Sequence, residues 1–259
     1  MENASKSIGI VLSGGGSKGI AHAGALQFLT EQGIHPSCIA GTSAGAIVGG
    51  LFAFGKTPEE ILEFFKSIYF FHWKHFTFKK AGLIDSESFK SYFAEILGDV
   101  TIGDLKIPAY ITATDLVKGK LKIFNSETKV IDAILASSSF PGMLSPYEIS
   151  KKLYSDGGIL NHFPTDILQG RCDYLIGVYV SPIQNIESKD LKSIKSVTSR
   201  AFDLLYANYN YQKFNLCDWV IEPKELANFS TFETSKTKMD TIFEIGYNEA
   251  KKSFQELNL

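Results

Sequence analysis

Residues 41–45 read GTSAG, and they follow a short apolar run at residues 38–40, CIA. A serine in this Gly-x-Ser-x-Gly pattern is typical of a nucleophile elbow, a sharp turn from a strand into a helix that exposes the hydroxyl. Residues 44–54 are rich in Ala, Ile, Val and Leu and end before Gly55, which predicts the helix. The sequence therefore places Ser43 near a helix N-terminus, where peptide dipoles stabilise developing negative charge.

Two further glycine motifs supply the other parts of an acyl-transfer site. Residues 13–19, SGGGSKG, join a predicted strand at 8–12 to a predicted helix at 19–30, and they offer backbone amides to an anion. Residues 156–158, DGG, place a carboxylate on a glycine-bounded turn. Because a nucleophile, an oxyanion-binding loop and a base are the parts of such a site, the three motifs together indicate an acyl-transfer enzyme.

These motifs together resemble the patatin-like phospholipase family, in particular bacterial patatin-like acyl hydrolases. The resemblance covers residues 7–180. It extends to the connecting segments 21–26 (AHAGAL), 101–105 (TIGDL), 112–116 (TATDL) and 136–141 (ASSSFP). It implies a three-layer α/β/α sandwich around a largely parallel sheet, a Ser–Asp dyad, and hydrolysis of acyl esters of lipids as in phospholipase A or lysophospholipase.

The resemblance assigns roles by motif position. Ser43 is the nucleophile and Asp156 the base, while Gly14, Gly15 and Gly16 form the oxyanion hole. The motifs are completed by Ser17, Lys18, Gly19, Gly41, Gly45, Gly157 and Gly158. Lys18 stands where arginine is also common in the family, and no metal or cofactor is expected.

Three alternatives remain open within this interpretation. His162 follows the Asp-Gly-Gly motif, so a Ser43–Asp156–His162 triad competes with the dyad, although six positions on one loop separate its last two members. The acyl-enzyme could also pass its acyl group to an alcohol or thiol acceptor, as an acyltransferase does. The scaffold could instead be a catalytically silent lipid-binding module, although all three motifs are intact.

Other interpretations of the glycine-rich segments fit less well. The uncharged stretch at 37–55 is diluted by glycines and bounded by Pro36 and Gly55, which argues against a transmembrane helix. A dinucleotide-binding loop at 14–19 would need an acidic residue about 20 positions later, and none is present. A phosphate-binding P-loop would end in Gly-Lys-Ser/Thr, whereas Gly19 is followed by Ile20.

Composition fits one enzyme domain of 259 residues. Hydrophobic residues make up 44% of the chain, enough for a large core, and the net charge of −2 argues against nucleic acid as a partner. Three widely spaced cysteines favour free thiols, and the polar N-terminus shows no signal peptide. We therefore expect a cytoplasmic protein that acts on a lipid or acyl-ester substrate, with peripheral contact to a membrane as a further expectation.

Strand and helix signals alternate along the chain, which predicts the parallel sheet. Residues 57–60 form a capping box that opens a helix, and a hairpin is expected to turn at residues 118–119. Residues 181–259 are expected to be a helical extension packed on the same domain. The aromatic segment at 64–78 is a candidate for a lid or a lipid-contacting surface. The aromatic segment at 199–214 is a candidate for a cover over the site or a dimer face, and core packing is the alternative for both.

Overall fold

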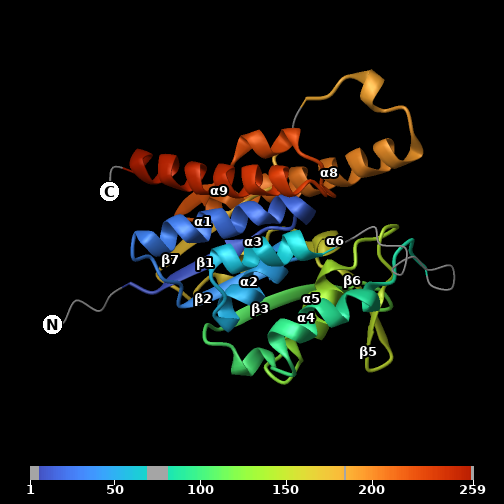
Figure 1. Cartoon of the computed structure of the whole chain (residues 1–259), viewed down its shortest axis with the longest axis horizontal. Helices are drawn as coiled ribbons and strands as arrows, with labels where there is room; N and C mark the ends of the chain where they lie inside the picture. The colour runs from blue at the N-terminus through green and yellow to red at the C-terminus, as the bar shows by residue number, and fades with distance from the viewer. Residues whose placement is uncertain (1–5, 69–80, 184, 258–259) are drawn as a thin grey trace.

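The computed structural model describes residues 6–68, 81–183 and 185–257, and its described part contains an eight-stranded mixed sheet (Figure 1). Neighbouring strands follow the order β5-β6-β3-β2-β1-β7-β8, and β4 pairs with β3. The neighbouring strands β3, β2, β1, β7 and β8 are parallel to one another. In contrast, β4, β5 and β6 form antiparallel pairs at one edge of the sheet. The strands are β1 (Ile8–Leu12), β2 (Cys38–Thr42), β3 (Ala109–Asp115), β4 (Lys120–Ile123), β5 (Tyr147–Ile149), β6 (Lys152–Asp156), β7 (Tyr174–Val178) and β8 (Trp219–Ile221).

Helices fill the connections between the strands. The α-helices are α1 (Ile20–Glu31), α2 (Ala44–Phe54), α3 (Pro58–Ser67), α4 (Lys90–Leu97), α5 (Val130–Ser138), α6 (Gly158–Asn161), α7 (Thr165–Leu168), α8 (Ile194–Lys213) and α9 (Lys236–Glu256). Short 3-10 helices are η1 (Gly16–Gly19), η3 (Ser86–Phe89), η4 (Ile102–Asp104), η5 (Ser188–Asp190), η6 (Phe214–Leu216) and η7 (Lys224–Asn228). The alternation of strands and helices confirms the predicted α/β class.

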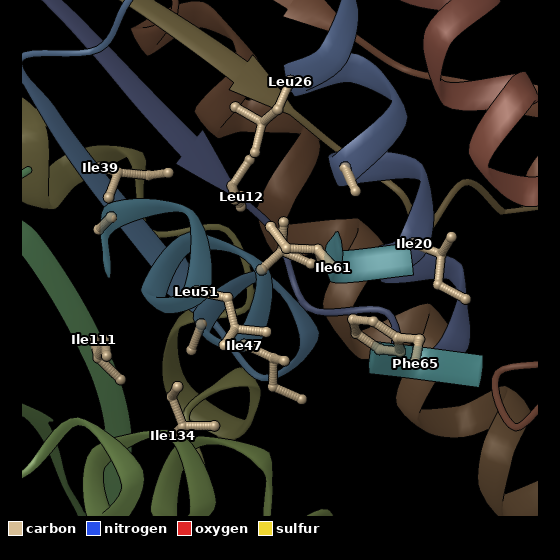
Figure 2. Packing of buried hydrophobic residues seen from close by; sticks show 14 of the residues in the cluster. Leu12, Ile20, Leu26, Ile39, Ile47, Leu51, Ile61, Phe65, Ile111 and Ile134 are labelled. Atoms are coloured by element: carbon tan, nitrogen blue, oxygen red, sulfur yellow. The ribbon is translucent and has the colours of Figure 1, made fainter. Parts of the chain in front are cut away.

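Alternating side chains of the central strands build a core on each face of the sheet. Ile10 and Leu12 of β1 point into the larger cluster, which α1, α2, α3, α4, α5 and α9 cover. Ile61 and Phe65 of α3 pack into this cluster (Figure 2). Val11 points the other way, into a smaller cluster with residues of α7 such as Leu168. The sheet is therefore covered by helices on both faces, as expected for a three-layer sandwich.

Helices α1 and α9 lie side by side with their backbones in close contact (Figure 1). A Cβ atom on Gly24 would collide with the carbonyl oxygen of Phe243, and one on Gly246 would collide with the carbonyl oxygen of Ala21. Glycine is therefore required at both positions for this approach. The segment after Val180 also adds β8 to the sheet beside β7, so it contributes to both the sheet and one helical layer.

Helix α3 and the hairpin between β3 and β4 form where the local signals predict them. Thr57 and Glu60 exchange the two hydrogen bonds of a capping box at the start of α3. Gly119 turns the hairpin between β3 and β4 with φ of 61°. The strand β5 and the short helices α6 and α7 were not predicted.

The aromatic segment at 64–78 lies only partly within the described residues, because residues 69–80 are outside them. Phe64 and Phe65 are buried in the core, which matches the packing alternative for that portion. All three cysteines are free, and Cys38 is buried. Within residues 6–68, 81–183 and 185–257, no helix combines the length and apolar character needed to cross a membrane.

Candidate active site

Ser43 occupies the turn between β2 and α2, as the Gly-x-Ser-x-Gly pattern predicts. Its backbone has φ of 55° and ψ of −122°, a combination that is unfavourable for a residue with a side chain and is found at functional turns. The side chain is partly exposed. A Cβ atom on Gly45 would collide with the carbonyl oxygen of Leu12, so a glycine allows α2 to begin directly against the end of β1. The Ser43 amide donates to Oγ of Ser137 over 2.8 Å, which holds the turn against α5.

Asp156 ends β6 and lies beside this turn. Its side chain is 2% exposed, and its Oδ1 accepts a hydrogen bond of 2.7 Å from the Gly158 amide. Burial raises the pKa of Asp156 to about 6, and the interactions with the Ser43 hydroxyl and the Gly158 amide partly offset this increase. The fold thus brings together two residues that are 113 positions apart in the chain, a candidate nucleophile and a carboxylate.

The glycine loop runs from the end of β1 to η1, and its amides have different partners. Gly14 N–H donates to the His162 carbonyl over 2.9 Å. In contrast, neither the Gly15 nor the Gly16 amide donates to another residue in the described part of the chain. Gly16 has φ of 58°, and a Cβ atom there would collide with the Thr231 carbonyl oxygen, so the loop conformation requires glycine. The amides available to an anion are therefore those of Gly15 and Gly16.

The other motif residues support this loop. Ser17 N–H donates to the Thr231 carbonyl over 2.8 Å, and a Cβ atom on Gly19 would meet Cβ of Ala44 at 2.5 Å. Burial lowers the pKa of Lys18, and the negative charge of Asp203 on α8 partly offsets that effect. Lys18 of the loop and Asp203 of α8 therefore interact electrostatically.

His162 is buried close to Gly14 and Gly158, with a side chain that is 6% exposed. Its ring stacks on Tyr206 of α8, with centroids 4.4 Å apart and planes within 7°. Its Nε2 lies 3.1 Å from Oγ of Ser181. Burial, together with the nearby His22, lowers the pKa of His162 to about 3, so the ring is neutral at physiological pH. In the described structure no hydrogen bond joins the His162 ring to Ser43 or Asp156.

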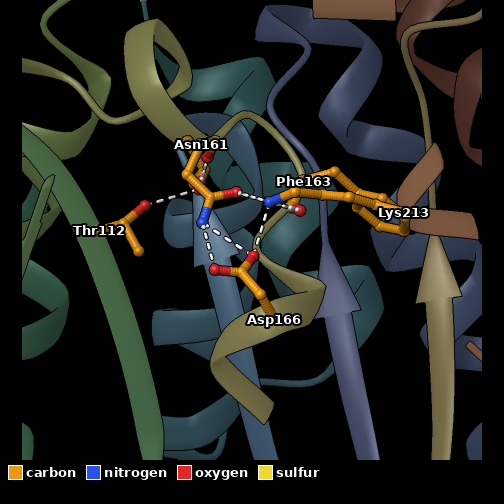
Figure 3. A network of polar contacts seen from close by, with 6 residues as sticks. Thr112, Asn161, Phe163, Asp166 and Lys213 are labelled. Atoms are coloured by element: carbon orange, nitrogen blue, oxygen red, sulfur yellow. Dashed lines mark hydrogen bonds and ion pairs between the residues drawn. The ribbon is translucent and has the colours of Figure 1, made fainter. Parts of the chain in front are cut away.

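A polar network around the buried Lys213 was not predicted from the sequence (Figure 3). Lys213, at the end of α8, is 7% exposed and forms an ion pair of 2.6 Å with Asp166. It also donates to Oδ1 of Asn161 over 2.6 Å, and the Asn161 carbonyl accepts from Thr42 over 2.9 Å. This network connects α8 to the loop after Asp156 and to the strand before Ser43. In the sequence, Lys213 is a single lysine within the aromatic segment at 199–214. Nothing near it in the chain indicates that its partners lie about 50 positions earlier.

A narrow apolar cavity of about 30 Å³ begins one helical turn beyond Ser43. Ile47, whose amide donates to the Ser43 carbonyl over 3.1 Å, forms one wall, and Ser138, next to Ser137, forms another. The remaining walls are apolar except for one serine: Ile68, Ser86, Phe89, Phe93, Leu135 and Leu144. A larger hollow of about 420 Å³ between α3 and α4 includes neither Ser43 nor Asp156 in its lining.

Among the described residues, no group of three or more His, Cys, Asp or Glu side chains is arranged to hold a metal ion.

Comparison with known proteins places this geometry in a family. The family model described as patatin-like phospholipase matches residues 10–168, which include Ser43, Asp156 and the glycine loop. The chain belongs to the patatin-like phospholipase family. An uncharacterised NTE family protein of Mycobacterium tuberculosis is 31% identical over 224 residues, covering 78% of this chain and 59% of the relative. The chain thus spans about three fifths of the length of that NTE family relative.

Two other similarities agree with the family assignment. A protein named lysophospholipase NTE1 from Candida glabrata is 29% identical over 192 residues, covering 70% of this chain and 11% of that protein. VipD from Legionella pneumophila has the same fold, with a TM-score of 0.66 and 15% identity, over 97% of this chain and 67% of that one. This patatin-like chain therefore shares its fold well beyond the matched domain, including the segment after β7.

Proposed function

We propose that the protein is a serine acyl hydrolase that cleaves fatty acyl esters of lipids, of the phospholipase A or lysophospholipase type. The observation that carries the proposal is the contact of the Ser43 hydroxyl, on a strained turn at a helix N-terminus, with the buried carboxylate of Asp156. The family membership and the lysophospholipase relative support the same chemistry.

The proposed reaction uses Asp156 as the base. Its carboxylate accepts the Ser43 proton as Oγ attacks the ester carbonyl, and the Gly15 and Gly16 amides donate hydrogen bonds to the oxyanion. Collapse of the tetrahedral intermediate breaks the bond to the alcohol, which leaves with the proton from Asp156. Water then gives up a proton to Asp156 and attacks the acyl-serine. Collapse of this second tetrahedral intermediate releases the fatty acid, and Asp156 returns the proton to Oγ of Ser43. Gly14 supports the loop in this scheme, because its amide is already paired with the His162 carbonyl.

The narrow apolar cavity that begins at Ile47 indicates a direction for the acyl chain, although its volume of about 30 Å³ admits only a water-sized group. Its walls start at Ile47, on the same face of α2 as Ser43, and are predominantly hydrophobic. Apolar walls favour a hydrocarbon chain over a polar substrate group. We propose that the acyl chain points toward these apolar walls, which must move apart to admit it, and that the alcohol portion of the lipid lies on the exposed side of Ser43.

We also propose that α8 contacts the lipid surface. Ile194, Val197, Ala201, Leu204 and Leu205 are exposed and recur at intervals of three or four residues, which gathers them on one face of the helix. The opposite face carries Phe202, which packs on Phe140, and Tyr206, which stacks on His162. The apolar outer face is therefore part of the same helix that contacts the active-site loop.

Hydrolysis by the purified protein tests the proposed function. Wild type and Ser43→Ala are compared on a soluble p-nitrophenyl acyl ester and on a phospholipid, and fatty acid release is measured. Wild-type turnover that Ser43→Ala abolishes, with unchanged circular dichroism, supports the hydrolase. Transfer of the acyl group to added glycerol in preference to water would assign an acyltransferase. Absence of turnover in the wild type would contradict both assignments.

A further inference from the structure

The carbonyl of Gly14, in the oxyanion loop, accepts hydrogen bonds from two hydroxyl groups, one buried and one partly buried. Ser13 Oγ donates to it over 2.9 Å and Ser181 Oγ over 3.0 Å. Because the peptide group is planar and trans, its C=O and N–H point in opposite directions. Fixing the Gly14 carbonyl therefore also fixes the direction of the Gly15 N–H, one of the two loop amides without a partner in the described structure.

The hydrogen bonds of Ser181 determine the protonation of His162. A serine hydroxyl has one hydrogen, and Ser181 gives it to the Gly14 carbonyl, which can only accept. The contact of 3.1 Å between Ser181 Oγ and His162 Nε2 must therefore be a hydrogen bond donated by the ring. His162 thus carries its proton on Nε2, and its Nδ1 holds a lone pair.

The surroundings of His162 hold the ring in this orientation. It stacks on Tyr206 and contacts the edge of Tyr179, with centroids 4.4 Å and 6.1 Å away respectively. The backbone carbonyl of the same residue accepts the Gly14 N–H over 2.9 Å. His162 therefore fixes both polar groups of Gly14. Its carbonyl accepts the Gly14 N–H directly, and its ring acts on the Gly14 carbonyl through the Ser181 hydroxyl.

We infer that Ser181 and His162 are positioning residues for the oxyanion hole, in which the His162 ring orients the Ser181 hydroxyl and that hydroxyl directs the Gly15 amide toward the reacting carbonyl. This inference rests on the proposed hydrolase. It assigns to His162 a role different from that of a base in a triad. It also explains why a neutral, buried histidine lies beside a Ser–Asp pair without a hydrogen bond to either member in the described structure.

Two single substitutions and their combination test the inference on the soluble ester. Loss of an oxyanion donor costs about 10²- to 10³-fold in rate. Since Ser13 still holds the Gly14 carbonyl, we expect Ser181→Ala to lower kcat by about tenfold, which is less than the full loss of a donor, with little change in KM. His162→Leu should have a similar effect. The double variant should be no slower than the slower single variant, because both residues act through one hydrogen-bonded unit.

A conservative variant separates positioning from proton transfer. His162→Gln retains an N–H donor at the place of Nε2 but cannot act as a base, so it should keep most of the wild-type kcat and the same pH dependence. A triad histidine would not tolerate this change. Ser253→Ala is the matched control, because its hydroxyl donates to the Glu249 carbonyl over 2.8 Å in α9 without contact to the loop, and its kcat should equal that of the wild type.

Nitrogen-15 NMR of the histidine rings provides a readout that does not depend on turnover. We expect His162 to be the neutral Nε2–H tautomer from pH 5 to 8 in wild type and in Ser43→Ala. An Nδ1–H tautomer, an inactive but folded His162→Gln, additive losses in the double variant, or an unchanged kcat in Ser181→Ala would each overturn the inference. Failure of the wild type to hydrolyse any ester would count against the proposed function instead, and the tautomer result would still test the hydrogen-bond assignment.

Discussion

At the scale of single residues, the proposed site depends on a carboxylate whose charged form is disfavoured by burial. Asp156 is almost inaccessible to water, and two polar contacts compensate only part of the cost of ionising it there. The resulting pKa of about 6 makes it a better proton acceptor near neutral pH than an exposed aspartate would be. A change of protonation near pH 6 cannot come from His162, because the pKa of its ring is lowered to about 3.

The pH dependence of activity and stability follows from this difference. Activity should rise with pH and reach half of its maximum near pH 6, as Asp156 becomes a carboxylate. Because the pKa is higher in the folded state than in the unfolded chain, the stability that Asp156 contributes is present below its unfolded value of about 4 and is lost as pH rises through about 6. Asp156→Asn should therefore be inactive, more stable than wild type at pH 8, and of similar stability at pH 4.

Thermal unfolding of both proteins at the two pH values measures this effect. Asp99→Asn is the control, since that exposed carboxylate is paired with Lys129, which lowers its pKa, and the substitution should give no gain at pH 8. Equal stability of wild type and Asp156→Asn at pH 8 would contradict a raised pKa.

At the scale of secondary-structure elements, α8 connects the site to the surface. Its inner face reaches the site through Tyr206, which stacks on His162, and through Lys213, which pairs with Asp166. Its outer face exposes Ile194, Val197 and Leu205, at 88%, 50% and 67% of their accessible surface. A helix with apolar residues on both faces normally lies in a core, so the outer face favours an apolar partner.

Vesicle binding tests the proposed contact of α8 with lipid. Full burial of each large aliphatic side chain contributes about 1.5 to 3 kcal/mol. Val197→Asp/Leu205→Asp should therefore weaken sedimentation with phosphatidylcholine vesicles by about tenfold or more, since 1.4 kcal/mol is a factor of ten. Hydrolysis of vesicle lipid should fall in parallel, while hydrolysis of the soluble ester stays unchanged. Val117→Asp, which alters an exposed apolar residue in the turn between β3 and β4, should bind vesicles as wild type does. Equal binding by the α8 variant would rule out this face.

Local chemistry explains which elements the sequence could predict. The capping box of α3 and the glycine turn before β4 are encoded in adjacent residues, and both form as expected. The hairpin between β5 and β6 was missed because Ser150 and Lys151 both have positive φ, at 49° and 63°, in a turn that usually contains Asn or Gly. The glycine loop and the Ser-Asp pair were predicted from their motifs, and their placement remains the basis of the proposal. The roles of Ser181 and Lys213 were not predictable, because their partners lie far away in the sequence.

At the scale of the whole molecule, we propose that residues 181–257 belong to the same domain as the matched family region. The close contact of α1 with α9, and the pairing of β8 with β7, support this assignment. Trp219 of β8 is 4% exposed and packs against Phe254 of α9, with ring centroids 5.7 Å apart. In a Trp73→Phe background, tryptophan fluorescence therefore reports on the C-terminal part, while esterase activity reports on the site.

A larger side chain at the α1–α9 contact tests the single domain. Gly246→Leu should lower the free energy of unfolding by about 3 kcal/mol or more, because a backbone collision cannot be relieved by a change of rotamer. In urea, activity and Trp219 fluorescence should be lost together, at a lower concentration than in wild type. Asn248→Leu introduces the same side chain at an exposed position of α9 and should unfold as wild type does. A urea concentration at which the fluorescence signal is lost but activity is retained would show that the C-terminal part unfolds independently of the site, which would contradict a single domain.

The contact between α1 and α9 also affects how the protein can fold during its synthesis. Helix α1 leaves the ribosome early, whereas α9 follows only after all eight strands of the described sheet have been made. Until then the surface of α1 around Gly24 has no partner helix, and its apolar residues are exposed to solvent. Contacts between such distant segments slow folding and leave intermediates prone to aggregation. The nascent chain is therefore expected to need chaperone protection of α1 until α9 emerges.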